Sequence, residues 1–101
     1  MNFLDDDYSE FLLEFAAKVE HPINIRMLKL QEELGEATEA FVSYLGFKPH
    51  VTATILDVGV ELADVIFTAL VVMVDLGLIP NDMLALQMRK AKAKYYPEGS
   101  E

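Results

Sequence analysis

Residues 58–74 read VGVELADVIFTALVVMV, and this stretch decides the fold. Drawn as a helix, it carries apolar side chains on nearly every side, which predicts a central helix packed against partners on several faces. Its most apolar run, Val65 to Val74, is about half as long as a membrane span, which needs roughly 20 residues. Because Asp64 and Asp75 also flank that run, we expect a buried core helix. Gly59 is expected to allow the close approach of another helix, since glycine otherwise lowers helix stability.

The sequence around this stretch predicts a single all-α domain over residues 1–101. Helical spacing of apolar residues, acidic helix starts and proline or glycine stop signals place four helices. They are expected over Asp6–Glu20, Ile23–Leu45, Thr52–Leu76 and Asn81–Tyr95. Gly46 and Gly77 are expected to end the second and third helices. The pattern contains no strand, internal repeat or linker, and the tail, residues 97–101, is expected to be disordered.

The composition favours a cytoplasmic homo-oligomer. Hydrophobic residues make up 52% of the chain and the mean hydropathy is +0.23, which is high for a small monomer with much surface to cover. We therefore expect a four-helix-bundle-like protomer assembled into a homo-oligomer. The net charge of −9 argues against binding a nucleic acid polymer through its phosphates. The absence of cysteine fits a reducing compartment, and the acidic start MNFLDDDYSE does not resemble a secretion signal.

Two pairs of acidic residues suggest the chemistry of the chain. Glu33 and Glu36 lie three residues apart in one predicted helix, and Glu61 and Asp64 lie three apart in the next. Residues at this spacing are neighbours on a helix surface, so the four carboxylates would meet if the helices pack side by side. Two carboxylates about 6 Å apart repel by roughly 3 kcal/mol at an effective dielectric constant near 20. Such a group needs a counter-charge, and oxygen ligands favour Mg²⁺, Mn²⁺ or Ca²⁺ over zinc.

A Mg²⁺ ion held by carboxylates keeps several waters and also takes phosphate oxygens, which is the chemistry of phosphoryl or nucleotidyl transfer. The acids differ in how well they fit this site. Glu61 and Asp64 stand out because their helix is otherwise nearly all apolar, whereas Glu32 and Glu39 lie further round theirs and suit a solvated face. Asp57, one turn before Glu61, is either a further ligand, a holder of water or a charge near the start of its helix.

The basic residues also have two interpretations each. Lys29 lies one turn before Glu33, so it either pairs with that glutamate or contacts a substrate phosphate. Lys90 and Lys94 share a face of the last helix, where they either reach phosphate across the site or complement the helix dipole. Neither histidine follows a glutamate by three residues, so the Glu-x-x-His pattern of di-iron bundles is missing.

The segment KLQEELGEATEAF at 29–41, followed by VELADVIF at 60–67, resembles the MazG-like family of all-α nucleoside triphosphate pyrophosphohydrolases. The pattern of that family is E-E-x-x-E, a variable gap and then E-x-x-D. In this chain it falls on Glu32, Glu33, Glu36, Glu61 and Asp64. The two motifs occur in order on adjacent predicted helices, which makes the pair more specific than either motif alone.

The resemblance implies Mg²⁺-dependent cleavage of a (d)NTP to (d)NMP and pyrophosphate, in nucleotide-pool housecleaning, with Mn²⁺ as a substitute ion. It implies metal ligands at Glu33, Glu36, Glu61 and Asp64 and catalytic roles for Glu32 and Glu33, with Glu32 orienting the attacking water. It also implies a homodimer or homotetramer whose sites draw on more than one subunit. Ala91 stands where the last helix of the family often carries an asparagine, although the basic residues Lys90 and Lys94 are kept.

Two other functions compete with this one. Phosphoribosyl-ATP pyrophosphatase has a similar helical fold and acidic motifs, but it typically has an aromatic–histidine pair after the second motif, where this chain has Phe67 and Thr68. A noncatalytic helical module for interaction or regulation is the second alternative, and the altered last helix favours it. No membrane association is expected under any of these interpretations.

Overall fold

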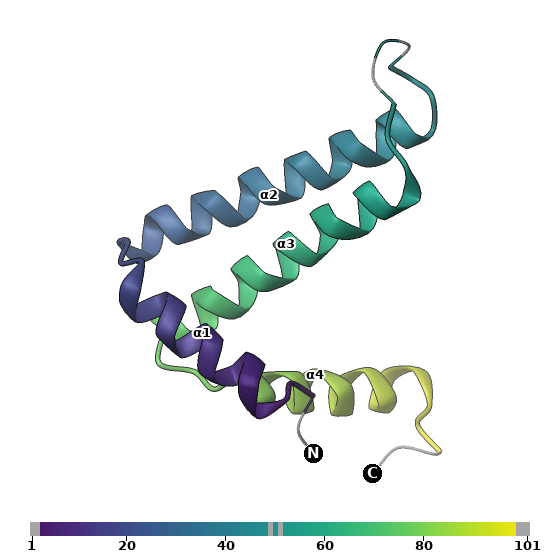
Figure 1. Ribbon diagram of the computed structural model, residues 1–101. Helices are drawn as coiled ribbons and strands as arrows, with labels where there is room; N and C mark the ends of the chain where they lie inside the picture. Colours follow the sequence, from purple (N-terminus) through teal and green to yellow (C-terminus); the bar gives the residue numbers. More distant parts are fainter. Residues whose placement is uncertain (1–2, 49, 51, 99–101) are drawn as a thin grey trace.

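A computed structural model of the chain describes residues 3–48, 50 and 52–98, and this part is all-helical. Its four helices are α1 (Asp6–Lys18), α2 (Ile23–Tyr44), α3 (Ile55–Asp75) and α4 (Pro80–Tyr95), as Figure 1 shows. The all-α class and the order of the helices are therefore confirmed. Of the tail predicted to be disordered, residues 99–101 lie outside the described residues.

The helix boundaries follow local capping signals. The Asp5 side chain caps α1 by accepting a hydrogen bond from a backbone N–H of its first turn. The third helix begins three residues later than predicted because Thr54, rather than an earlier residue, forms a capping box with Asp57. Gly46 and Gly77 follow the ends of α2 and α3 with φ angles of 86° and 79°. Glycine adopts this left-handed conformation without strain, so both predicted stop signals are confirmed.

The long helices α2 and α3 lie side by side and antiparallel, and together they form the body of the protomer (Figure 1). Helix α1 packs on the C-terminal half of α3, where Leu12, Leu70 and Val71 are buried against one another. Phe11 and Phe15 of α1 extend this core by packing their rings on Phe67 of α3. Because α3 contacts α1, α2 and α4, its predicted central position is confirmed.

One partly buried ion pair joins three helices near the start of α2 and the end of α3. The Arg26 guanidinium of α2 donates to the Asp75 carboxylate of α3 over 2.6 Å, and the Arg26 residue is only 5% exposed. The same guanidinium donates to the Val19 carbonyl just after α1 and lies over the Phe15 ring. Arg26 thereby fixes the ends of α1, α2 and α3 relative to one another.

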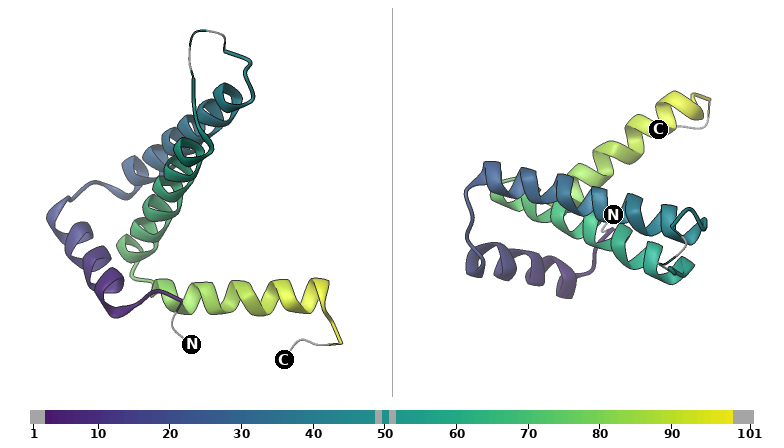
Figure 2. Two further views of the ribbon diagram at one scale, coloured as in Figure 1. Left: turned by 45° about the vertical axis from the view of Figure 1, so that its right-hand side comes forward. Right: turned by 90° about the horizontal axis from the view of Figure 1, so that it is seen from above.

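The last helix leaves this body. Figure 2 shows α1 on one side of the α2/α3 pair and α4 running out on the other side. Helices α3 and α4 meet at 113°, and α4 is attached near its start, where the Asn81 side chain bonds to the Leu4 backbone. The radius of gyration is 16.4 Å, against roughly 13 Å for a compact domain of this size. The chain is thus an open arrangement of helices.

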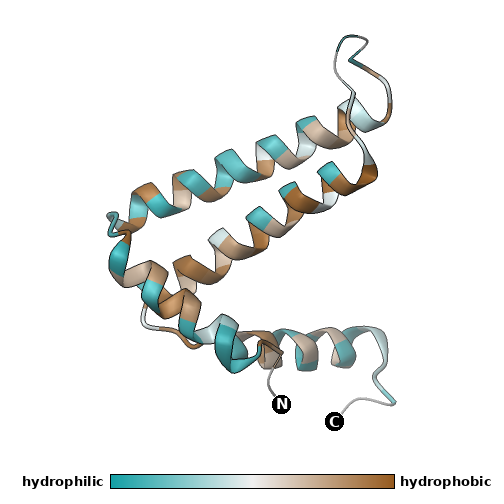
Figure 3. Ribbon diagram, viewed as in Figure 1, coloured by the Kyte–Doolittle hydropathy of each residue, from teal (hydrophilic) through white to brown (hydrophobic). Residues whose placement is uncertain are grey.

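Many large apolar side chains stay exposed in this open arrangement. Figure 3 shows that hydrophobic residues are most frequent along α3. On α3 they include Ile55, Leu62 and Ile66, which share one stripe on a different side of the helix from the residues that hold α1. Gly59 lies close to this stripe, and no atom lies within 4 Å of the position a Cβ would take there. The predicted close helix approach at Gly59 is therefore wrong for the protomer, because no described helix covers that side.

None of the described helices is by itself long and apolar enough to cross a membrane; α3 and α4 reach such a length and composition only as a sharply bent pair.

Candidate metal centre and the adjoining cleft

The packing of α2 against α3 brings acidic residues of both helices together. One carboxylate oxygen from each of Glu33, Glu61 and Asp64 lies within 4.8 Å of the other two. Glu33 comes from α2, and the other two come from α3. The structure thus gathers three of the four predicted ligands in one small volume. One divalent ion can bridge carboxylate oxygens that lie this close together.

The acid triad, Glu33, Glu61 and Asp64, is unusual because part of it is buried. Glu33 is only 9% exposed. The Oε2 atom of Glu61 is fully buried and has no hydrogen-bond partner among the described residues. Buried carboxylate oxygens normally have a partner, and one without a partner indicates a missing ion or water. The triad therefore has a set of carboxylate oxygens that could hold a metal ion.

Glu36 borders the triad without joining it. Its side chain is exposed, and it is not among the groups within 4.8 Å of one another. Its pKa is nevertheless raised, first by the negative charge of Glu33, then by desolvation and by the charge of Glu61. A cation at the triad would lie close enough to attract the Glu36 carboxylate as well.

Lys29 is the positive charge beside the triad. Its ammonium lies 3.3 Å from Glu32 Oε1 and 3.4 Å from Glu33 Oε1. These two glutamates raise the pKa of Lys29, with the hydrogen bond to Glu32 as the largest cause. The pairing predicted for Lys29 and Glu33 is thus present, and Glu32 shares it. The side chains of Lys29 and Glu32 are both more than half exposed, so they can rearrange.

Asp57 lies at the start of α3 and outside the triad. Its carboxylate accepts hydrogen bonds from the Thr54 backbone N–H at 2.8 Å and from the Thr54 hydroxyl at 3.1 Å. These bonds lower the pKa of Asp57. Of the three roles left open for this residue, the structure favours the charge at the helix start. Glu39 is exposed and pairs with Lys48, which agrees with the solvated face predicted for it.

Lys90 and Lys94 do not meet the acids within one protomer. Both belong to the part of α4 that runs away from the body, and the Lys94 ammonium lies over the ring of its neighbour Tyr95. The predicted reach of these lysines across the site is not seen in the protomer, because the bend between α3 and α4 directs them elsewhere.

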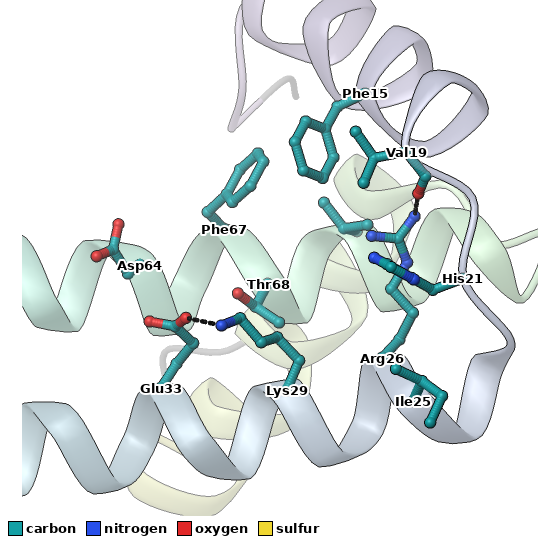
Figure 4. A pocket seen from close by; sticks show the side chains of 11 residues that line it. Phe15, Val19, His21, Ile25, Arg26, Lys29, Glu33, Asp64, Phe67 and Thr68 are labelled. Carbon is teal, nitrogen blue, oxygen red and sulfur yellow. Dashed lines mark hydrogen bonds and ion pairs between the residues drawn. The ribbon is translucent and has the colours of Figure 1, made fainter.

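A cleft of about 380 Å³ opens next to the triad, between α1, α2 and α3. Figure 4 shows Glu33 and Asp64 at one end of it and Arg26 and His21 at the other. The remaining lining is mainly apolar or aromatic and comprises Phe15, Val19, Ile25, Lys29, Phe67, Thr68 and Val71. The residue pattern along the chain did not predict this cleft. The signal it offered was a polar Thr68 and an aromatic Phe67 one turn after the acids of α3.

Comparison with protein-family models, with curated proteins and with solved structures gives no match for this chain. The resemblance to the MazG-like family therefore remains a hypothesis that depends on the two acidic motifs and on the site that they form.

Proposed function

We propose that this chain is a Mg²⁺-dependent nucleoside triphosphate pyrophosphohydrolase of the cytoplasm. It would hydrolyse a (d)NTP to (d)NMP and pyrophosphate, as expected of a MazG-like enzyme that cleans the nucleotide pool. The observation that supports this function best is the buried, unpartnered carboxylate oxygen of Glu61, a residue that forms the triad with Glu33 and Asp64. A purely structural role gives no reason to bury that charge without a partner.

Glu33, Glu61 and Asp64 would hold the ion, and Glu36, whose pKa responds to the charges of Glu33 and Glu61, would be the further ligand. A Mg²⁺ ion, or Mn²⁺ in its place, neutralises phosphate charge and lowers the pKa of a bound water when it occupies such a site. The chain itself supplies the arrangement around that ion. Glu32 is exposed at the edge of the triad, where its carboxylate would orient the attacking water and accept a proton from it.

The adjoining cleft supports a nucleotide as the substrate. The triphosphate would lie at the acid end, where a cation can bridge it to the triad. The aromatic surfaces of Phe15 and Phe67 at the other side of the cleft suit a base or sugar. The cleft volume of about 380 Å³ lies in the range of small-molecule sites.

The exposed apolar stripes support a homodimer or homotetramer. Leu62 and Ile66 of α3 are exposed beside Leu34 and Phe41 of α2. By helical geometry, both stripes lie on the face of the α2/α3 pair away from α1, so a second copy could cover them without blocking the cleft. Gly59 would then find the close helix contact it lacks in the protomer. In such an assembly Lys90 and Lys94 of α4 could reach the acid triad of a neighbouring copy.

The direct test is pyrophosphate release from a nucleotide panel in the presence of Mg²⁺. The panel contains dCTP, dUTP, dTTP, ATP and phosphoribosyl-ATP, and each is assayed with the wild type and with Glu61→Gln. Glu14→Gln is the matched control, because Glu14 is an exposed glutamate of α1. We expect release by the wild type and by the control, and loss by Glu61→Gln.

The same panel separates the alternatives. Turnover of phosphoribosyl-ATP alone would assign the histidine-biosynthesis enzyme instead. The large exposed apolar surface is what favours a noncatalytic interaction module, and that module would be the answer if neither the wild type nor the variants turned over any nucleotide.

A further inference from the structure

Lys29 is placed to act as the counter-ion of the acid triad when no metal is bound. Glu33 is nearly buried, and its carboxylate needs a positive partner because two further carboxylates lie within 4.8 Å. The Lys29 ammonium provides that charge at 3.4 Å, from the cleft side of the site (Figure 4). The oxygen it pairs with belongs to one of the groups that a divalent ion would use.

The two cationic side chains that line the cleft from α2 differ in their freedom to move. Arg26 is 5% exposed and held by Asp75 and the Val19 carbonyl, so it is fixed. The Lys29 side chain is 52% exposed, and its pairs with Glu32 and Glu33 are both longer than 3.2 Å. A lysine of this kind has several accessible rotamers and can leave one partner for another.

We propose that Lys29 exchanges its place at Glu33 for a divalent cation and then binds the substrate phosphate in the cleft. The binding of Lys29 to substrate phosphate rests on the proposed function, whereas its exchange with a cation does not. Lys29 lines the same cleft as Thr68 and Phe67, the cleft that would hold the nucleotide. Its three N–H donors would pass from a carboxylate to phosphate oxygens, which leaves no charge unpaired at either end.

This exchange couples the two ligands. An ion that binds alone must compete with the Lys29 ammonium for Glu33, so its affinity is reduced. An ion that binds together with a triphosphate gives the released ammonium a new partner, so each ligand raises the affinity for the other. Lys29 is then a positioning residue whose loss changes two affinities in opposite directions.

The test measures both affinities in Lys29→Met. Mn²⁺ alone is titrated calorimetrically into the full chain, and an α,β-imido deoxynucleoside triphosphate is then titrated in saturating Mn²⁺. We expect Mn²⁺ alone to bind roughly two- to five-fold more tightly, the range of a partly exposed ion pair. We expect the analogue to bind on the order of tenfold more weakly, because a charged hydrogen bond to phosphate is lost.

Two further variants control this experiment. Lys29→Arg keeps the charge and should preserve the competition with Mn²⁺. Lys18→Met removes an exposed lysine from α1, outside the cleft and the triad, and should change neither affinity, so it separates a local effect from the change in net charge. Each variant is checked by circular dichroism at the same protein concentration.

The outcomes are distinct. Equal or weaker Mn²⁺ binding by Lys29→Met would overturn the exchange. Tighter Mn²⁺ binding with unchanged affinity for the analogue would overturn the phosphate role alone. If Lys29→Met binds Mn²⁺ more tightly but the wild type releases no pyrophosphate from any nucleotide, the exchange would be supported and the proposed function would be rejected.

Discussion

Replacing Glu61 by glutamine should stabilise the metal-free protein and remove its response to metal. The reason is the crowding of charge at the acid triad, where oxygens lie within 4.8 Å of one another. At that distance two carboxylates repel by about 3.5 kcal/mol at an effective dielectric constant of 20, and by about 0.9 kcal/mol in water. The larger value suits the nearly buried Glu33 as the partner of Glu61, and the smaller one suits the exposed Asp64.

One effect reduces the net gain, because the Lys29 ammonium, 3.4 Å from Glu33, already offsets part of the repulsion. The cost of a buried polar group without a partner, about 1–3 kcal/mol, is common to the carboxylate and to the glutamine amide and therefore largely cancels. We therefore expect Glu61→Gln to raise the free energy of unfolding by about 1–3 kcal/mol in EDTA. For a domain of this size each kcal/mol corresponds to about 4–8 °C in Tm.

Metal should make the wild type more stable than Glu61→Gln, which reverses their order of stability in EDTA. An ion at 100 times its Kd stabilises the protein that binds it by about 2.7 kcal/mol, and Glu61→Gln should lose most of this. The assay is urea unfolding at pH 8 followed by circular dichroism, in EDTA and in MnCl₂, at one protein concentration. Glu14→Gln is the control and should behave as the wild type. A Glu61→Gln protein that is less stable than the wild type in EDTA would refute the idea of an uncompensated acid triad.

Three further predictions follow from the packing and the charges. Arg26→Met should lower the free energy of unfolding by about 1.5–3 kcal/mol, measured by urea unfolding, because it removes a short charged hydrogen bond to the Asp75 carboxylate, whose side chain is only 17% exposed; a loss below 1 kcal/mol would contradict this. Asp57 has a lowered pKa, so its stabilising effect is present at neutral pH and is lost as the pH falls below its ordinary value of 3.8; the stability difference between the wild type and Asp57→Asn should shrink over that range and would otherwise argue against the cap. Ile66→Asp should lower the oligomeric state in sedimentation velocity, whereas Leu13→Asp on exposed α1 should not; equal behaviour of both variants would place the interface elsewhere.

The fold could be predicted largely from the sequence because its signals are local. Pro22, Gly46 and Gly77 stop helices by their own backbone restrictions, and those boundaries agree with the structure within two residues. The start of α3 was misplaced because two threonines compete as its cap. Only Thr54 has an acidic residue three positions later, and that reciprocal pair decides the boundary.

The candidate site could be predicted only in part, because helical geometry treats the two members of each acidic pair differently. Three residues advance a helix by about 300°, so the second acid of each pair points roughly 60° away from the first. Glu33 is buried and Glu61 is half-buried, while Glu36 and Asp64 are both exposed. Asp64 nevertheless joins the triad and Glu36 does not. Spacing predicts that both pairs are neighbours, but the rotation of α2 and α3 about their axes decides which exposed acid reaches the carboxylates of the other helix.

The cleft and the Arg26–Asp75 pair could not be predicted from spacing at all. They join residues 49 positions apart in the chain and depend on how α1 lies across α3. The sequence contains a lone arginine at the start of α2 and an aspartate at the end of α3, and neither has a partner on its own helix that would indicate burial. Long-range pairs of this kind become visible only when the crossing of the helices is known.

The position of Glu61 separates a functional origin for the acids from a structural one. A helix selected only for packing would carry an apolar residue at 61, since replacing buried charge by apolar surface is often neutral or stabilising. The chain instead places Glu61 on its most apolar helix, about two and a half turns before the core residue Leu70. One oxygen of this glutamate has no partner among the described residues. Departures from local consistency of this kind concentrate at functional sites. The arrangement is therefore best explained by a ligand that supplies the missing positive charge. If Glu61→Gln is more stable than the wild type without metal but has no activity, then Glu61 lowers stability in return for function.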